Sequence, residues 1–197
     1  YKNDYLPEAL VNFLGAMSYT FSKELLTKEE MVKEFELSKV HKSGAVFNVE
    51  KLNWLNSQYI KKLSPEEFKK VSGMPEITDV AVPLITERLE KLSDVQEFSY
   101  LWQEPDYSKE LLKWKKFDFP EVLNSLEKTK LMLSEKNLRS ALDDLAKEVG
   151  DRGLVYWPLR VALTGKEKSP DPVEVANVIG KEETLKRIES AIKKLKV

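Results

Sequence analysis

Helix start signals recur along this chain, and they constrain its fold more than any other feature. Thr27 is followed three residues later by Glu30, and Ser64-Pro65 is followed by Glu67. A hydroxyl residue with a glutamate three positions on satisfies backbone N–H groups that a helix leaves free at its start, and proline fits the first helical position. Apolar residues then recur at intervals of three and four, as on one face of a helix. The sequence therefore predicts an all-α fold with no significant sheet.

The other predicted helix boundaries rest on Ser, Asn, Asp, Pro and Gly, which commonly begin or end helices. The apolar pattern from Val80 to Leu92 predicts a helix that contains Arg88 and that tolerates Pro83 only in its first turn. Ala45-Val46-Phe47 is the only short extended candidate. Together these patterns predict about a dozen short helices. Further helix starts are expected at Pro7, Asn48, Ser93, Ser108, Phe119, Ser134, Trp157 and Asp171 and after Gly180.

Missing residue types exclude several kinds of chemistry. The 197 residues include no Cys and a single His, His41, so disulfides, thiolate metal sites and a Cys nucleophile are excluded. The chain also lacks a phosphate-binding GxxxxGK(S/T) pattern. Carboxylate pairs such as Asp143-Asp144 are interpreted as solvated helix faces, and His41 as a surface loop residue. We therefore predict no catalytic residue and no metal site.

The ends and the apolar runs of the chain carry no membrane or export signal. No apolar run approaches the roughly 20 residues that cross a bilayer, so we expect no membrane-spanning segment. No signal-peptide pattern is visible near the first residue. A start at Tyr1 instead of Met is typical of a fragment or a processed chain.

Charge is distributed unevenly, although the net charge is only −1. Residues 73–150 carry 11 Lys and Arg against 16 Asp and Glu, whereas residues 151–197 carry 10 against 7. The sequence pI of about 6.1 lies below the value of about 9 that is typical of dedicated nucleic-acid binders. Any contact with a polyanion must therefore be local.

The stretch from Tyr156 to Gly180 has the residues that a nucleotide-binding loop needs. Arg160 carries a planar fork of donors that can bond to a base or stack on it. Ser169 to Pro172 form a stiff loop before a helix start, where backbone N–H groups are free to bind. Unpaired RNA bases are read readily by such sites. The alternative is structural, with Arg160 paired to a neighbouring acid and the loop serving only as a helix start.

Five motifs resemble those of one known family, in the same order. The resemblance is to the C-terminal half of bacterial glutamyl-tRNA synthetases, and it extends over nearly the whole chain, although residues 61–154 match weakly. The motifs are YLPEALVNFL (residues 5–14), FEL with KSGAVFNVEKL (35–37 and 42–52), WLNSQYI (54–60), PLRVALTG (158–165) and GKEETLKRI (180–188).

This resemblance implies a helical stem-contact region over residues 1–72, followed by an α-helical cage that binds the tRNA anticodon. The cage would comprise two helical subdomains, residues 73–130 and 131–197. The residues implied to contact the anticodon are Arg88, for the last base, and Arg160, Ser169, Pro170 and Pro172. Those implied to contact the tRNA stem are His41, Lys42 and Ser43.

The loop departs from the family pattern at two positions. Asp171 and Pro172 stand where relatives often have Gly and an apolar residue, so we expect this loop to meet the base edges differently.

The resemblance also implies an enzyme of which this chain is only a part. The parent would be a glutamate–tRNA ligase that uses ATP and Mg²⁺ in a catalytic half with HIGH and KMSKS motifs. Neither motif is present, since His41 is followed by Lys42. We therefore expect the fragment to be inactive, to need no cofactor and to bind tRNA(Glu) as a cytoplasmic monomer, with no DNA or membrane partner. Whether the parent also charges glutamine tRNA stays open.

Two other functions fit parts of the sequence. The acidic middle and the aromatic residues Trp102 and Trp114 would suit a helical protein-interaction module without an RNA role. A divergent enzyme using Asp and Glu chemistry would show a concave pocket lined with paired carboxylates.

Overall fold

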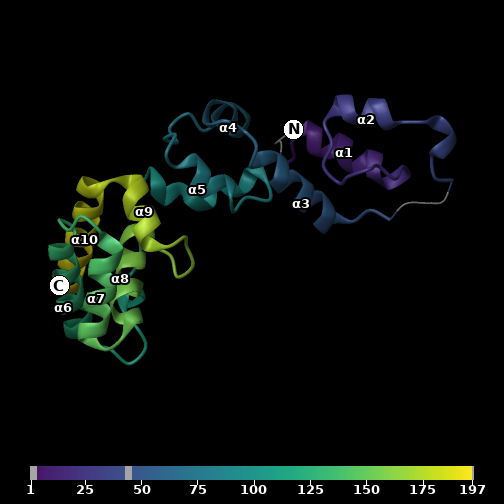
Figure 1. Ribbon diagram of the computed structural model, residues 1–197. Coiled ribbons are helices and arrows are strands. Elements are labelled where there is room, and N and C mark those ends of the chain that lie inside the picture. The colour runs from purple at the N-terminus through teal and green to yellow at the C-terminus, as the bar shows by residue number, and fades with distance from the viewer. Residues whose placement is uncertain (1–3, 43–45, 197) are drawn as a thin grey trace. The chain divides into compact units, whose positions relative to one another are not determined.

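The computed structural model describes residues 4–42 and 46–196, and within them the chain is all-α, as predicted (Figure 1). These residues form ten α-helices and three 3-10 helices, and no strand. The α-helices are α1 (Pro7–Ser18), α2 (Lys28–Glu34), α3 (Val49–Ile60), α4 (Pro65–Ser72), α5 (Val82–Thr86), α6 (Phe119–Met132), α7 (Leu138–Val149), α8 (Arg152–Thr164), α9 (Pro172–Ile179) and α10 (Lys181–Lys196). The 3-10 helices are η1 (Leu37–Lys39), η2 (Leu92–Leu101) and η3 (Lys109–Leu112).

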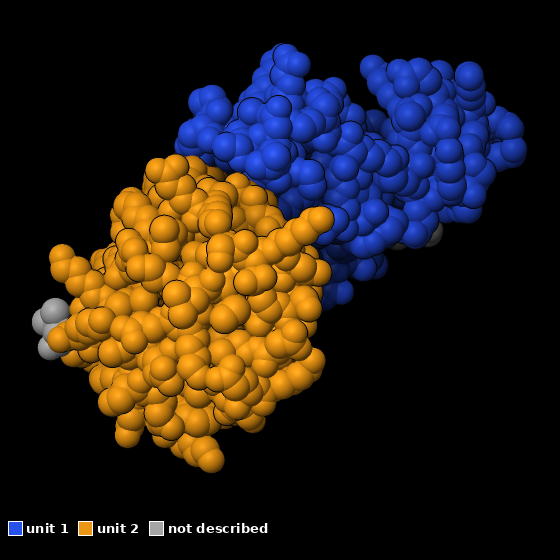
Figure 2. All heavy atoms as spheres, turned by 60° about the vertical axis from the view of Figure 1, so that its left-hand side comes forward, with its two compact units in different colours: residues 1–98 blue, residues 99–197 orange. Residues whose placement is uncertain are grey.

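The chain divides into two compact units, an N-terminal unit of residues 1–98 and a C-terminal unit of residues 99–197 (Figure 2). Helices α1 to α5 belong to the first unit and α6 to α10 to the second. No helix in the described parts of either unit is long and apolar enough to span a membrane.

The predicted helix starts at Thr27 and Ser64 are confirmed. The Thr27 hydroxyl accepts from the backbone N–H of Glu30 at 3.2 Å, and the Glu30 carboxylate accepts from the backbone N–H of Thr27 at 2.8 Å. Ser64 and Glu67 form the same reciprocal pair at the start of α4. The starts of α2 and α4 could be predicted from these two patterns because the residues that form each capping box lie within four positions of one another.

The helix predicted from Val80 to Leu92 is wrong in its length. Pro83 does lie in the first turn, but α5 ends at Thr86 and Arg88 lies beyond it. The Arg88 backbone N–H donates to Ile85 O at 2.9 Å, an i→i−3 bond that tightens the chain into a turn. Further on, the Leu92 N–H donates to Asp4 O at 3.1 Å. The leucines and the isoleucine between Leu84 and Leu92 are therefore buried by a tertiary turn instead of by a continuous helix, and Val80 is exposed.

The predicted start of α7 at Ser134 is also wrong. Asn137 is the N-cap, since its side chain accepts from the Ser140 N–H at 3.1 Å. The Ser134 hydroxyl instead donates to Leu131 O at 3.1 Å, in the last turn of α6. Both Ser and Asn are good caps, and only the turn between the two helices decides which of them is used.

Helix α8 begins five residues before the predicted start at Trp157, and Pro158 lies inside it. Its N-cap is Asp151, whose side chain accepts from the Leu154 N–H at 3.1 Å. A proline inside a helix leaves the carbonyl four residues earlier without its usual partner. Here that carbonyl, Leu154 O, accepts from the hydroxyl of Ser125 on α6 at 2.8 Å. A donor from another helix thus stabilises the proline position.

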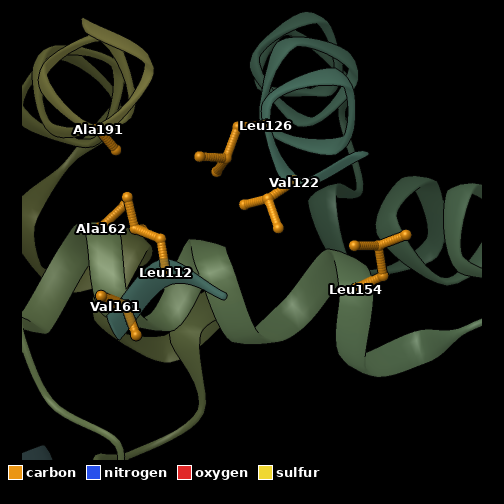
Figure 3. Packing of buried hydrophobic residues seen from close by; sticks show 7 residues of the cluster. All are labelled: Leu112, Val122, Leu126, Leu154, Val161, Ala162 and Ala191. Carbon is orange, nitrogen blue, oxygen red and sulfur yellow. The ribbon is translucent and has the colours of Figure 1, made fainter. Parts of the chain in front are cut away.

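The core of the C-terminal unit lies between α6, α8, α10 and η3. Figure 3 shows buried side chains from these four elements gathered around one interior. The cluster consists of Leu112, Val122, Leu126, Leu154, Val161, Ala162 and Ala191. Helix α8 contributes three of these residues, so it is the central element on which the adjoining loop is built.

A buried asparagine organises the N-terminal unit. Asn56, from the WLNSQYI motif, accepts from the Leu6 N–H at 2.8 Å and donates to Asp4 O and Glu90 O at 3.0 and 2.6 Å. One side chain on α3 therefore connects the start of α1 to the segment that follows α5. Its full burial explains why every one of these bonds is needed.

Candidate functional site

The candidate site is the loop that joins α8 to α9. Gly165 ends α8 with a φ of 66°, a left-handed conformation that glycine adopts without strain. Asp171 caps α9, since its carboxylate accepts from the Val173 N–H at 2.9 Å. The helix end at Gly165 and the helix start at Asp171-Pro172 are confirmed.

Arg160 holds this loop from the side of α8. Its Nη1 atom donates to Ser169 O at 2.5 Å, to Ser169 Oγ at 3.0 Å and to Pro170 O at 3.1 Å. Among the described residues its Nε and Nη2 atoms have no protein partner, and no carboxylate forms an ion pair with it. The predicted alternative of an Arg160–acid pair is therefore absent from this part of the chain. The half-buried guanidinium fixes the loop with one nitrogen and keeps further donors for a ligand.

The loop residues that the sequence singled out differ in accessibility. Pro170 and Pro172 are buried, whereas Ser169 is half-buried. The two prolines therefore shape the loop from inside. Ser169 lies beside Arg160 with part of its surface open, so these two residues form the accessible part of the predicted set.

A second arginine, which the sequence analysis missed, holds the loop from α7. Arg139 forms a bidentate ion pair with Asp171, with Nη2 at 2.6 Å from one carboxylate oxygen and Nη1 at 3.2 Å from the other. Burial raises the pKa of Asp171, but the hydrogen bonds from Arg139 and Val173 outweigh it, and the pKa is lowered overall. Arg139 lies 32 residues from Asp171, and no local pattern indicates the pairing.

This ion pair predicts a pH-dependent stability. In the D171N variant the side chain can still cap α9, but the charge pair with Arg139 is lost, which should cost about 1 kcal/mol at neutral pH. Because the folded-state pKa of Asp171 is lowered, the wild-type advantage is present above the unfolded pKa of about 3.9 and disappears as the pH falls through the folded value.

Thermal unfolding followed by circular dichroism, from neutral pH down to about pH 2.5, measures this difference. Asp144→Asn, an exposed aspartate on α7, serves as the control. A stability difference that stays constant across the pH range would contradict the assignment.

Arg88 lies in the N-terminal unit, whereas Arg160 lies in the C-terminal unit. Arg88 is exposed, donates from Nη1 to Leu84 O at 2.9 Å and lies 3.6 Å from a carboxylate oxygen of Glu87. Its side chain thus folds back onto the end of α5. The two arginines that are predicted to contact the anticodon therefore belong to different units of the chain.

Two of the predicted stem-contact residues, His41 and Lys42, lie on the surface of the N-terminal unit. His41 is exposed, and its Nε2 atom is 3.1 Å from the hydroxyl of Thr20. Its backbone N–H donates to Ser18 O at 2.8 Å, which fixes the loop against the end of α1. Lys42 is exposed, and Ser43 lies outside the described residues. The interpretation of His41 as a surface loop residue is confirmed.

The carboxylates considered for catalysis have structural partners. Asp143 accepts from the Tyr156 hydroxyl at 2.7 Å and from Arg152 Nη1 at 2.5 Å, and Asp144 pairs with Lys147 at 2.8 Å. The hydrogen bond from Tyr156 is the main cause of the lowered pKa of Asp143. A general acid at neutral pH needs the opposite shift. In residues 4–42 and 46–196 no cluster of three His, Asp or Glu side chains could hold a metal ion.

Comparison with known protein families gives two matches that together span most of the chain. Residues 30–192 match the family described as "Anticodon binding domain", and residues 1–54 match "tRNA synthetases class I (E and Q), catalytic domain".

Relatives and solved structures extend these matches. Glutamate–tRNA ligases of Clostridium acetobutylicum and Clostridium kluyveri are 34% and 35% identical over 97% and 98% of this chain. The chain spans 44% of each of those proteins. A glutamate tRNA ligase from Elizabethkingia meningosepticum, solved in complex with its amino acid, superposes with a TM-score of 0.81 at 33% identity. That likeness covers 96% of this chain and 41% of the other.

Proposed function

This chain belongs to the anticodon-binding domain family, and from that premise we propose that it is the tRNA-binding part of a glutamate–tRNA ligase. The observation that carries the proposal is the geometry of Arg160. One guanidinium nitrogen holds Ser169 and Pro170, and the remaining donors are available to a base edge. A donor fork fixed in place loses little freedom when it binds, which favours selective contact with an unpaired base.

The proposed role is to report tRNA identity to the rest of the enzyme. The relatives are more than twice as long as the part of them that this chain matches. In the proposed parent, ATP and Mg²⁺ bind to the catalytic half, and contacts with the cognate anticodon position the acceptor end of tRNA(Glu) there. Binding energy gained far from the reacting atoms can in this way favour the correct substrate.

Several finer assignments belong to the same proposal. We retain a stem-contact region over residues 1–72 and two anticodon-binding subdomains over 73–130 and 131–197. His41, Lys42 and Ser43 are proposed to contact the tRNA stem, and Arg88 the last anticodon base. The protein is proposed to act as a cytoplasmic monomer.

The test is the anticodon preference of the Arg160→Ala variant. Filter binding to tRNA(Glu) and to an otherwise identical tRNA with a swapped anticodon should show a clear preference in the wild type. We expect the variant to lose about 1–3 kcal/mol of binding to tRNA(Glu), and less with the swapped anticodon, because a base contact is removed.

Arg152→Ala is the matched control, since it removes the same charge from the first turn of the same helix. It should leave the ratio of the two affinities unchanged. Equal losses on both tRNAs for Arg160→Ala would reduce its role to a charge effect. Absence of any tRNA binding by the wild type at low salt would reject the function and favour a protein-interaction module.

A further inference from the structure

The segment from Lys109 to Phe119 concentrates lysines over aromatic rings. It contains four lysines and three half-buried aromatic residues within eleven positions. The Lys113 and Lys115 ammonium groups lie 4.5 and 4.7 Å from the ring centroids of Phe119 and Trp114. The Lys109 and Lys116 ammonium groups lie 5.5 and 5.7 Å from the rings of Phe119 and Phe117. Each ammonium group is thus held above a ring face.

Trp114 anchors this segment to the start of α8. Its Nε1 atom donates to the Asp151 carboxylate at 3.0 Å, and its ring lies 5.1 Å from that of Trp157. The ring also covers Gly153 so closely that a Cβ atom there would lie 2.1 Å from it. The lysines around Trp114 therefore belong to a segment that is anchored to the start of α8.

Lys115 has an uncommon backbone conformation. Its φ of 49° is the only positive value for a non-glycine residue in the described parts of the chain. A lysine in this region is disfavoured relative to glycine, and such positions are concentrated at functional sites. The turn leaves Lys113, Lys115 and Lys116 exposed on either side of the half-buried Trp114.

The local charge of this segment is positive, although the surrounding region is acidic. Residues 109–119 carry four lysines against one glutamate and one aspartate. Lys113 lies 3.4 Å from Asp118, whereas Lys115 and Lys116 have no carboxylate within ion-pair distance among the residues with known positions. The two unpaired ammonium groups are available to an external anion. Lysines act as point charges, which suits phosphate groups.

The lysine segment and the loop that joins α8 to α9 adjoin the same side of α8. Gly153, Trp157 and Arg160 are spaced i, i+4 and i+7, so they fall along one stripe of the helix. Gly153, beneath Trp114, and Arg160 are separated by about 10 Å along the helix axis. A single RNA strand can therefore approach both groups at once.

We propose that Lys113, Lys115 and Lys116, arranged around Trp114, form a binding site for the phosphodiester backbone of RNA. The inference rests on the proposed function, because the RNA would be the tRNA whose anticodon meets Arg160. The lysines contact phosphates and carry no base preference, whereas Arg160 supplies the selectivity. Because the ring faces hold the ammonium groups in place, binding costs little additional side-chain entropy.

The test compares two double variants that remove the same charge. K115A/K116A removes the unpaired lysines of the site. K181A/K193A removes two exposed lysines of α10 that have neither a ring nor a carboxylate partner in the described chain. Filter binding to tRNA(Glu) and to the anticodon-swapped tRNA is measured across a series of salt concentrations, with circular dichroism to confirm that both variants are folded.

We expect K115A/K116A to weaken binding about five- to tenfold on both tRNAs, and to lower the slope of log K against log salt by about 1.4–1.8, the value for two lost phosphate contacts. K181A/K193A should change binding less than twofold. K115R/K116R, which keeps the charge, should restore the salt dependence.

Other outcomes separate this inference from the proposed function. Equal losses for the two double variants, or no loss for K115A/K116A while the anticodon preference persists, would overturn the phosphate site alone. A loss confined to tRNA(Glu) would also overturn it, because phosphate contacts carry no sequence preference. If the wild type binds both tRNAs equally and K115A/K116A binds both weakly, the result supports the phosphate site and rejects the anticodon function. A wild type that binds no tRNA would overturn both.

Discussion

Replacing Arg187 with Ala is expected to destabilise the C-terminal unit by about 3–5 kcal/mol, because it breaks a buried network of charge and hydrogen bonds. Arg187 is only 3% exposed. Its Nη1 atom donates to Tyr100 O and Leu163 O, both at 2.6 Å, and Nη2 donates to Gln103 O at 3.2 Å. The Nε atom pairs with Glu183 at 2.7 Å.

The cost is large because several partners are left without a donor at once. Leu163 O belongs to the last turn of α8, where carbonyls have no partner within the helix. Each buried polar group left unsatisfied costs about 1–3 kcal/mol. Arg187 therefore joins α10 to the end of α8, to the last turn of η2 and to Gln103, which follows η2.

Urea unfolding monitored by tryptophan fluorescence and circular dichroism measures this effect. Lys186→Ala is the matched control, since Lys186 is the neighbouring cation on α10, is exposed and also pairs with Glu183. Its removal should destabilise the unit far less, because ion pairs between exposed side chains contribute little to stability. If both variants unfold at the same urea concentration, the buried network contributes nothing and the assignment is wrong.

Replacing Gly153 with Ala is expected to destabilise the same unit by about 3 kcal/mol, because the new methyl group overlaps a packed ring. A Cβ atom at this position would lie 2.1 to 2.3 Å from three atoms of the Trp114 indole. The ring would have to leave, which would break its bond to Asp151 and its contact with Trp157. Glycine to alanine stabilises a helix interior by about 1 kcal/mol and should still favour the helix in the first turn, where Gly153 lies, so the expected sign is reversed.

A double-mutant cycle with Trp114→Ala tests the cause. With the indole removed, Gly153→Ala should become neutral or stabilising, because only the helix preference is left. Gly15→Ala in α1 is a second control, since a Cβ atom there would lie 3.1 Å from one atom of the Phe21 ring and needs only a small shift. A cost for Gly153→Ala that persists without Trp114 would show that the overlap is not its source.

The sequence predicted most helix ends and much of the candidate loop. Thr27, Ser64, Gly165 and Asp171 all begin or end helices as expected. These signals can be read locally because a cap and its partners lie within a few residues of each other. The apolar periodicity likewise identified the all-α class, since a buried helix face repeats every three or four residues.

Longer-range partners decided what the sequence left open. A proline normally suggests a helix start or break, yet Pro158 lies inside α8 because Ser125 bonds to the freed carbonyl. The pattern after α5 looked helical, but the chain turns at Arg88. In both cases a tertiary contact outweighs a local preference.

In the candidate site, too, the sequence indicated some residues and the tertiary structure decided their partners. The sequence alone indicated Arg160 and the Ser169–Pro172 loop, because a donor fork near a stiff loop is a local feature. Only the tertiary structure decided that Arg160 holds that loop by its carbonyls and that Arg139 holds Asp171 from another helix. The physical reason is that an ion pair or hydrogen bond depends on the distance between two atoms, and for residues far apart in the chain the fold alone sets that distance.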